Sequence, residues 1–272
     1  NYTFTGGGGK ERLPSGTTFT DNNITLYTEY GITDRLTASV SIPYKRLRSS
    51  YLQEFQSGQT IRSRRVVKHY TGIGDMDFGL KYCFLDQPVV TALQFITKTA
   101  WAYSRDEKVM PGNNQNDYEA RILFGKSLWP FPGYCGAEFG YRWRTGDPSD
   151  EYRYLLEFGF NPFKKLALRF KLDGIKSARN ASVRKPPAVE PTCYIDEETG
   201  QVIRTGSGVQ QPFILNPSLG LQYDLGKLEM TASFQAAKNW FLELTYTSYP
   251  YGKNISPGDQ YSFGIVYYFT GR

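Results

Sequence analysis

The chain contains a single histidine, His69, and histidine is the residue that most often serves as a catalytic base. A hydrolytic site would also need a nucleophile and an acid that orients the base. His69 follows Lys68 in a basic stretch, and no flanking motif supplies such partners. We therefore expect an exposed histidine without chemistry, and we predict that the protein is not an enzyme.

Asp75 and Asp77 are the carboxylates whose spacing comes nearest to an acid–base pair. Residues two apart on a strand lie on the same face, so the two groups would be coupled acids. Lys81 falls on that face as well, and we expect it to neutralise the pair. This favours structural ion pairing over catalysis.

Metal and cofactor chemistry finds little support in the sequence. The acidic run from Asp196 to Gly200 offers clustered oxygens, but it lacks the spacing of a calcium-binding loop and is typical of a hairpin turn. The three cysteines, Cys83, Cys135 and Cys193, are odd in number and irregularly spaced, which indicates free thiols instead of a disulfide framework or a zinc site. No metal and no cofactor is predicted.

Four basic residues form the densest charged cluster: Arg62, Arg64, Arg65 and Lys68. At an extracellular rim their side chains would contact the phosphates of lipopolysaccharide, which arginine binds in a bidentate manner. Capture of an anionic solute is the alternative. No nucleic-acid-binding signature accompanies the net charge of +6, so we predict no nucleic-acid partner and relate the excess to anionic lipid headgroups.

Alternation of large apolar residues with small or charged ones runs through the whole chain. It is clearest in 76–84 and 261–269, where every second residue is aromatic, aliphatic or methionine. A period of two indicates β-strands, because successive side chains leave opposite faces of the backbone. No apolar run approaches the roughly 18 residues that a membrane-spanning helix needs. The pattern predicts an all-β protein.

The two faces of the predicted strands distinguish a membrane barrel from a soluble sandwich. Apolar side chains cover one face of nearly every strand, and no remaining segment would bury them. A membrane barrel turns such faces outward to lipid, where an Arg or Lys at the midplane costs about 2–4 kcal/mol. The charged residues must then face the lumen, where they line a pore or pair with one another to brace the wall. The lumen-lining candidates are Asp75, Asp77, Lys81, Lys98, Glu119, Arg121, Glu138, Arg142, Arg144, Glu157, Arg169 and Lys171.

Turn residues divide the chain into the strands of one transmembrane antiparallel up-and-down β-barrel. The expected strands are 2–8, 17–30, 36–48, 73–85, 89–103, 116–128, 134–145, 151–160, 164–175, 240–250 and 259–269, with one more membrane strand within 212–237. The total is about twelve, and an even number would place both termini in the periplasm. Residues 1–272 are predicted to form a single outer-membrane domain, with long extracellular loops at 49–72 and 177–211.

Several stretches together resemble one family of outer-membrane barrels. They are Tyr30–Leu36 followed by Ser41–Tyr44, the glycine–aspartate strand Gly74–Tyr82, and Tyr251–Asn254 ahead of the closing aromatic strand. The family includes the channels linked to phenol meta-pathway degradation, and the resemblance spans nearly the whole chain. It implies a monomeric barrel of about twelve strands that passes small, often hydrophobic, compounds, and it implies no catalytic residues. The 177–211 segment departs from the family pattern.

The leading hypothesis is a channel in the bacterial outer membrane for passive uptake of small solutes, hydrophobic or aromatic ones included. A non-conducting structural or assembly component of an envelope complex is the alternative, and an outer-membrane enzyme is the least favoured. The expected partners are outer-membrane lipid, lipopolysaccharide and the solute, with the protein a monomer or part of a larger complex. We further expect 177–211 to fold over the pore mouth, where its acidic turn would pair with Arg142 or Arg144.

Overall fold

The structure of the protein, a computed structural model, describes residues 2–4, 7–12, 16–57, 60–104, 106–146, 148–181, 193–195, 202–204 and 222–269. These residues form β1 (Tyr2–Phe4), β2 (Lys10–Arg12), β3 (Thr18–Gly31), β4 (Leu36–Ser57), β5 (Thr60–Ile73), β6 (Met76–Leu85), β7 (Val90–Thr99), β8 (Asp117–Ser127), β9 (Gly133–Arg144), β10 (Glu151–Phe163), β11 (Leu166–Ser177), β12 (Cys193–Ile195), β13 (Val202–Arg204), β14 (Asp224–Ala237), β15 (Trp240–Lys253) and β16 (Gln260–Tyr267). Within this described part, no helix is long and apolar enough to cross a membrane.

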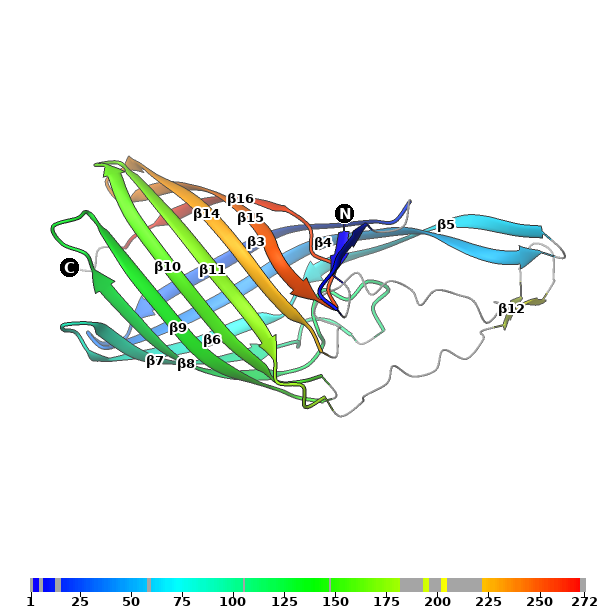
Figure 1. The fold of residues 1–272 in the computed structure, drawn as a ribbon, viewed down its shortest axis with the longest axis horizontal. Coiled ribbons are helices and arrows are strands. Elements are labelled where there is room, and N and C mark those ends of the chain that lie inside the picture. The colour runs from blue at the N-terminus through cyan, green and yellow to red at the C-terminus, as the bar shows by residue number, and fades with distance from the viewer. Residues whose placement is uncertain are drawn as a thin grey trace.

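Twelve strands form one antiparallel sheet, which confirms the all-β, up-and-down architecture predicted from the sequence. The strand order is β16-β15-β14-β11-β10-β9-β8-β7-β6-β4-β3, and β5 pairs with β4 beside this path. Figure 1 shows the sheet curling round into the wall of a barrel. β3 and β16 are its edges, and no pairing joins the described residues of these two strands.

The wall has two unlike ends. Short turns join the strands at one end, which we call the turn end: 32–35, 86–89, 128–132, 164–165 and 238–239. Longer connections lie at the other end, which we call the mouth end: 100–116, 145–150, 178–223 and 254–259. The predicted alternation of short and long connections is therefore present.

The stretch 49–72, predicted as a loop, is instead a β-hairpin. β4 continues past the wall to Ser57, and β5 returns along it in a regular ladder in which Tyr51 faces Val66. The turn-end half of β4 pairs with β6, and β5 leads directly into β6, so the hairpin is a projection of the wall itself (Figure 1). The loop prediction was wrong because basic and apolar residues are mixed on both faces of this hairpin, so the period-two signal of a strand is weak there.

The predicted first wall strand, 2–8, is not part of the wall. β1 pairs with β2 in a separate two-stranded sheet, and Phe4 forms a bridge with Ile255 at the mouth end. Gly8 lies between β1 and β2 with a φ of 84°, a conformation that glycine adopts without strain, so the chain reverses there instead of continuing as a strand. The twelfth strand of the sheet is β5. β1 consequently lies at the mouth end, whereas β16 ends at the turn end, so the expectation of both ends of the chain on one side was wrong (Figure 1).

The region 212–237 contributes one wall strand, as predicted. This strand is β14, which pairs with β11 and β15. Residues 212–221 lie outside the described part of the chain, and so does the acidic turn at 196–200. On either side of that turn β12 pairs antiparallel with β13, which supports its interpretation as the turn of a hairpin.

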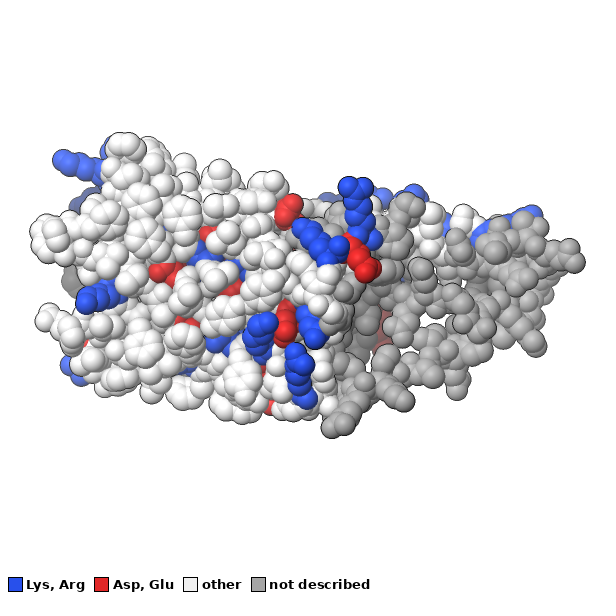
Figure 2. All heavy atoms as spheres, in the orientation of Figure 1, with Lys and Arg blue, Asp and Glu red and all other residues white. Residues whose placement is uncertain are grey.

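The two faces of the wall have opposite chemistry. Large apolar side chains are exposed on the outer face, where Phe78, Leu244 and Phe263 expose 38%, 61% and 69% of their surface. Figure 2 shows this outer surface as largely uncharged over β10, β11 and β14. Exposed aromatic residues lie toward both ends, with Trp129, Phe163 and Trp240 at the turn end and Trp101, Trp143 and Tyr261 at the mouth end. Aromatic girdles of this kind mark the two interfaces of a membrane.

Candidate channel interior

The inner face of the wall carries many ion pairs, and the largest connected group joins β8, β9, β10, β11 and β14. The twelve residues predicted to line the lumen all lie on wall strands or directly beside one, and each except Asp77 takes part in an ion pair. Asp77 lies opposite Lys98 in the β6–β7 register. The bracing role that the sequence left open beside pore lining is therefore present in the structure.

Glu119 on β8 is the centre of this network. Its carboxylate pairs with Arg121 of the same strand and lies 2.6 Å from Nη2 of Arg142 on β9. Arg121 also forms an ion pair with Glu138, whose carboxylate oxygen lies 2.9 Å from Nη1 of Arg121. The absence of a side chain at Gly140 makes room for this arrangement, because a Cβ there would lie 2.7 Å from Cγ of Arg121. Glu119 is only 2% exposed, and a carboxylate so deeply buried is stable only when it is paired.

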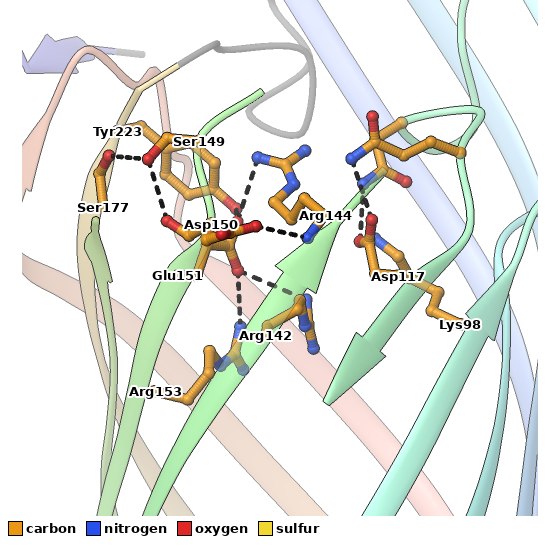
Figure 3. A network of polar contacts seen from close by, with 12 residues as sticks. Lys98, Asp117, Arg142, Arg144, Ser149, Asp150, Glu151, Arg153, Ser177 and Tyr223 are labelled. Carbon is orange, nitrogen blue, oxygen red and sulfur yellow. Dashed lines mark hydrogen bonds and ion pairs between the residues drawn. The ribbon is translucent and has the colours of Figure 1, made fainter. Parts of the chain in front are cut away.

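Three arginines converge on Glu151, the first residue of β10, at the mouth end (Figure 3). Guanidinium nitrogens of Arg144, Arg142 and Arg153 lie 3.2, 3.6 and 3.8 Å from its carboxylate. The hydroxyl of Tyr223 donates a hydrogen bond to it at 2.9 Å, and burial, followed by the charge of Glu151, raises the pKa of that tyrosine. Sequence reasoning missed both Glu151 and Tyr223. Glu151 shares the inner face with Arg153 by alternation and was detectable, whereas nothing in the sequence marks Tyr223.

Lys98 links two acids beside the connection between β7 and β8. Its Nζ lies 2.6 Å from Asp117 and 3.5 Å from Asp75. Asp117 is 1% exposed and also accepts hydrogen bonds from the side-chain amides of Asn113 and Gln115. Every formal charge in this group therefore has a partner of opposite sign or a hydrogen-bond donor.

The sequence suggested that Lys81 neutralises Asp75 and Asp77, but the structure shows a different pairing. Lys81 pairs instead with Glu29 on β3 at 3.7 Å. Positions 75 and 81 are separated by about 20 Å along an extended strand, whereas cross-strand neighbours are about 5 Å apart. The expectation was wrong because it compared residues along one strand and left out the adjacent strands.

The ion pairs from the middle of β11 toward the turn end are less buried than those around Glu119 and Glu151. Lys171 lies between Glu157 and Glu229, at 3.7 and 3.8 Å, and Arg169 lies 3.6 Å from Glu243. The paired groups in this half retain access to solvent, which weakens each interaction.

A cavity of about 300 Å³ opens in the interior at the turn end. Apolar side chains form part of its lining, namely Val90, Ala92, Leu123 and Leu155. Lys81 and Glu138 are among the charged groups around it. A cavity with an apolar strip and a few charged groups suits a small amphiphilic molecule.

Two hydrophobic clusters occupy the mouth end. The N-terminal cluster consists of Phe4, Ile175, Tyr223, Leu225 and Ile255. The hairpin cluster consists of Leu47, Tyr70 and Val109, with Phe19 and Tyr103 packed against it. The guanidinium of Arg144 lies 5.9 Å from the centre of the Tyr223 ring, so the ion-pair network continues into the N-terminal cluster.

The β9–β10 connection at this end is fixed by Asp150. Its carboxylate accepts hydrogen bonds from the backbone N–H of Arg144, the side-chain amide of Asn180 and the hydroxyl of Tyr141, each at 2.8 Å. Burial raises the pKa of Asp150, but these donors outweigh it and hold the pKa below its ordinary value.

The expected contact between the acidic turn of 177–211 and the lumen bases stays a prediction. Arg142 and Arg144 are already paired with Glu119 and Glu151. The acidic turn itself lies outside the described residues.

The basic cluster lies on β5, in the projecting hairpin. Arg62, Arg64 and Arg65 are exposed, while Lys68 is half-buried with its Nζ 5.8 Å from the centre of the Tyr51 ring. His69 is an exposed strand residue of the same hairpin.

In the part of the chain that the structure describes, no three potential metal ligands come together, and Cys83 and Cys135 are free thiols.

Comparisons with known proteins extend this picture at the level of the fold. No protein-family model and no curated protein sequence matches the chain. Among solved structures, the chain is similar to the COG4313 outer membrane channel from Pseudomonas putida F1, with a TM-score of 0.60 and 14% sequence identity over 98% of this chain and 88% of that one. The fold is thus that of an outer-membrane channel, which agrees with the resemblance inferred from the sequence.

Proposed function

We propose that this protein is a channel in the bacterial outer membrane through which small solutes pass passively. The observation that carries the proposal is the sidedness of the wall: large apolar side chains face outward on the same strands whose charged residues pair inside. A soluble protein would bury the apolar face, whereas a membrane barrel exposes it to lipid. The fold shared with an outer-membrane channel supports the same conclusion.

Reconstitution into planar lipid bilayers tests the proposal directly. Purified, refolded protein should produce discrete single-channel steps, and proteoliposomes should swell in isosmotic solutions of small solutes. A heat-denatured sample is the control for detergent artefacts. Absence of both signals from protein that shows the heat-modifiable gel mobility of a folded barrel would contradict the proposal.

Small aromatic or hydrophobic compounds are the solutes that the interior suits best. The cavity at the turn end places Leu123 and Leu155 beside Lys81, so an aromatic ring with one anionic group would find both an apolar surface and a cation. Swelling of proteoliposomes in sodium benzoate should exceed swelling in sodium gluconate, an anion with a hydroxylated chain in place of the ring. Equal swelling rates in the two salts would contradict the preference for aromatic solutes and would leave a channel that selects by size alone.

A non-conducting structural component of the envelope is the second candidate. The buried ion pairs and the two hydrophobic clusters at the mouth end favour it, because they fill space that an open pore would need. This function predicts that no variant conducts, however its mouth is altered.

The basic hairpin gives the proposed channel a contact with the outer leaflet. Arg46 and Arg48 are exposed and follow Tyr44 on the outer face of β4, and Arg65 lies on the same face of the β5 partner strand. Arginines directly above lipid-facing side chains are placed to meet lipopolysaccharide phosphates. Arg62, Arg64 and Lys68 lie on the opposite face of β5. Replacing Arg46, Arg48 and Arg65 with glutamine should therefore weaken binding of the purified protein to lipopolysaccharide more than replacing Arg62, Arg64 and Lys68 does. Unchanged binding in both variants would exclude the hairpin as the contact.

A further inference from the structure

We infer that residues 106–116, in the connection between β7 and β8, form the constriction of the channel, and that Asp75 is the residue that positions them. We call these residues the mouth segment. The inference rests on the proposed channel function. It assigns the restriction of solute size to the mouth segment and not to 177–211, the segment whose length drew attention in the sequence.

The mouth segment turns into the barrel instead of projecting away from it. Pro111 is among the most deeply buried residues of the protein, and Val109 and Asn113 are 8% and 9% exposed. Surface connections normally remain exposed, because water satisfies their backbone groups. Burial of three residues in one connection indicates that it lies against the inner face of the wall.

Asp75 holds the central part of the mouth segment. Its carboxylate accepts a hydrogen bond from the backbone N–H of Asn113 at 3.2 Å and another from the hydroxyl of Tyr103. The same tyrosine oxygen accepts a hydrogen bond from the backbone N–H of Asn114 at 2.8 Å. A Cβ at Gly112 would overlap the Asp75 carboxylate, so only glycine permits this approach.

Apolar packing carries the mouth segment toward the β4–β5 side of the wall. Val109 packs in the hairpin cluster with Leu47 and Tyr70, which belong to β4 and β5. The segment begins after β7 and ends at β8, and β6 separates β7 from β4 in the sheet. It therefore reaches past an intervening strand along the inside of the mouth.

Polar contacts continue from the mouth segment to the adjacent strands β8, β9 and β10. The side-chain amide of Asn113 donates to Asp117 at 3.0 Å, and Asp117 lies opposite Arg144 in the β8–β9 register. Arg144 then forms an ion pair with Glu151, which accepts a hydrogen bond from the hydroxyl of Tyr223. A chain of contacts along the inner wall thus joins the hairpin cluster to the N-terminal cluster through the mouth segment. The mouth segment is therefore fixed on the inner face at the mouth end, where its volume narrows the opening.

Removal of the mouth segment is the first test. Residues 106–114 are replaced by a short Gly-Ser linker, and single-channel conductance and proteoliposome swelling are measured with sugars of increasing size. Conductance should rise severalfold, and larger sugars should enter. The control places the same linker at the tip of the β4–β5 hairpin, in place of 54–61, and should leave conductance unchanged because the hairpin projects away from the mouth. Heat-modifiable gel mobility confirms that both variants fold.

Loosening the anchor is the second test, and it keeps the chain length intact. Tyr103→Phe removes the hydroxyl that joins Asp75 to Asn114, and it should raise mean conductance by less than the deletion does. Tyr118→Phe is the matched control, because Tyr118 is exposed. Fixing the segment instead, with Leu47→Cys and Val109→Cys in a background where the three native cysteines are serine, should lower conductance until a reductant is added.

The outcomes separate the constriction from the channel. If the unaltered protein conducts and the folded deletion variant conducts no better, the constriction is wrong and the proposed function stands. If the unaltered protein is silent and the deletion variant conducts, both inferences are supported. If every folded form is silent, the channel fails and the constriction fails with it.

Discussion

The mouth end and the turn end of this barrel are built from the same strands, yet their interiors differ. At the mouth end, Glu151 and Asp117 are almost completely buried among arginines, lysine and amide donors, between two hydrophobic clusters. At the turn end, the interior is a cavity of about 300 Å³ whose ion pairs remain open to solvent. The wall itself does not set the width of the opening, because connections and charged side chains fill one end and leave the other hollow.

This difference assigns separate tasks to the two ends. Buried charges require complete pairing, so the mouth end is rigid and sensitive to change. The cavity at the turn end tolerates substitution, because its side chains have space and solvent around them. We expect stability to depend on the mouth end and solute preference to depend on the cavity.

Glu151→Gln should have the largest effect on stability. Arg142, Arg144 and Arg153 would lose their shared carboxylate, and removal of one partner from a buried ionic group costs about 3–5 kcal/mol. Urea unfolding in lipid vesicles measures the loss. Glu157→Gln at the cavity is the matched control and should cost about 1 kcal/mol or less. Equal losses at the two positions would contradict the contrast between the ends.

A change of face midway along β6 should rank next. Leu80→Arg places a cation on the outer face, where Leu80 is exposed beside Phe95, and should impair membrane insertion by about 2–4 kcal/mol. Asp77→Asn, on the inner face of the same strand, should leave the barrel intact. Heat-modifiable gel mobility of the two variants decides, and equal tolerance of both would reverse the assignment of the faces.

Filling the cavity should alter permeation with little change in stability. Leu155→Trp places a larger side chain among Val90, Ala92 and Leu123 and should slow swelling of proteoliposomes in benzoate. Leu156→Trp, on the outer face, is the control for side-chain size. A stability loss from Leu155→Trp as large as that from Glu151→Gln would show that the cavity is not a permissive region.

The smallest predicted effect concerns pH at the mouth end. The pKa of Asp150 is lower folded than unfolded, so this group stabilises the β9–β10 connection above its ordinary pKa of about 4, and the contribution is lost as the pH falls through the folded value. Proteolysis of this connection should therefore increase at strongly acidic pH, measured with an acid-active protease. Asp150→Asn should be cleaved readily at all pH values, and an unchanged acid response in that variant would exclude Asp150 as the cause.

The wall was predictable from the sequence because it rests on a local signal. Alternation in 76–84 specifies both the strand and its two faces, and β6 covers the same stretch. The inner charges followed from the same rule, since charges on the outer face are costly. The hairpin 49–72 was missed because basic and apolar residues share both of its faces, with Arg64 and Val66 on one face and Arg65 and Val67 on the other.

The mouth end was not predictable, because it depends on contacts between residues that are far apart in the chain. The hydrogen bond from Tyr223 to Glu151 joins residues 72 positions apart in the chain, and the hydrogen bond from the backbone N–H of Asn113 to Asp75 joins residues 38 positions apart. The prediction that 177–211 narrows the mouth used length as its signal. In the shorter mouth segment the sequence shows only Pro111 and Gly112. The need for glycine at position 112 is visible only in the structure, where the Asp75 carboxylate occupies the space of a side chain.

The length of β4 has a consequence for how a cell displays this protein. β4 runs for 22 residues, and at about 3.3 Å per residue it measures about 70 Å. A strand that crosses a bilayer uses only about 9–11 residues, so much of the β4–β5 hairpin stands clear of the lipid. In the orientation that we propose, with the hairpin at the outer leaflet, an antibody or a bacteriophage approaching the cell would meet this hairpin before it met the channel. An epitope tag inserted at 58–59 should therefore report surface exposure in living cells without disturbing transport.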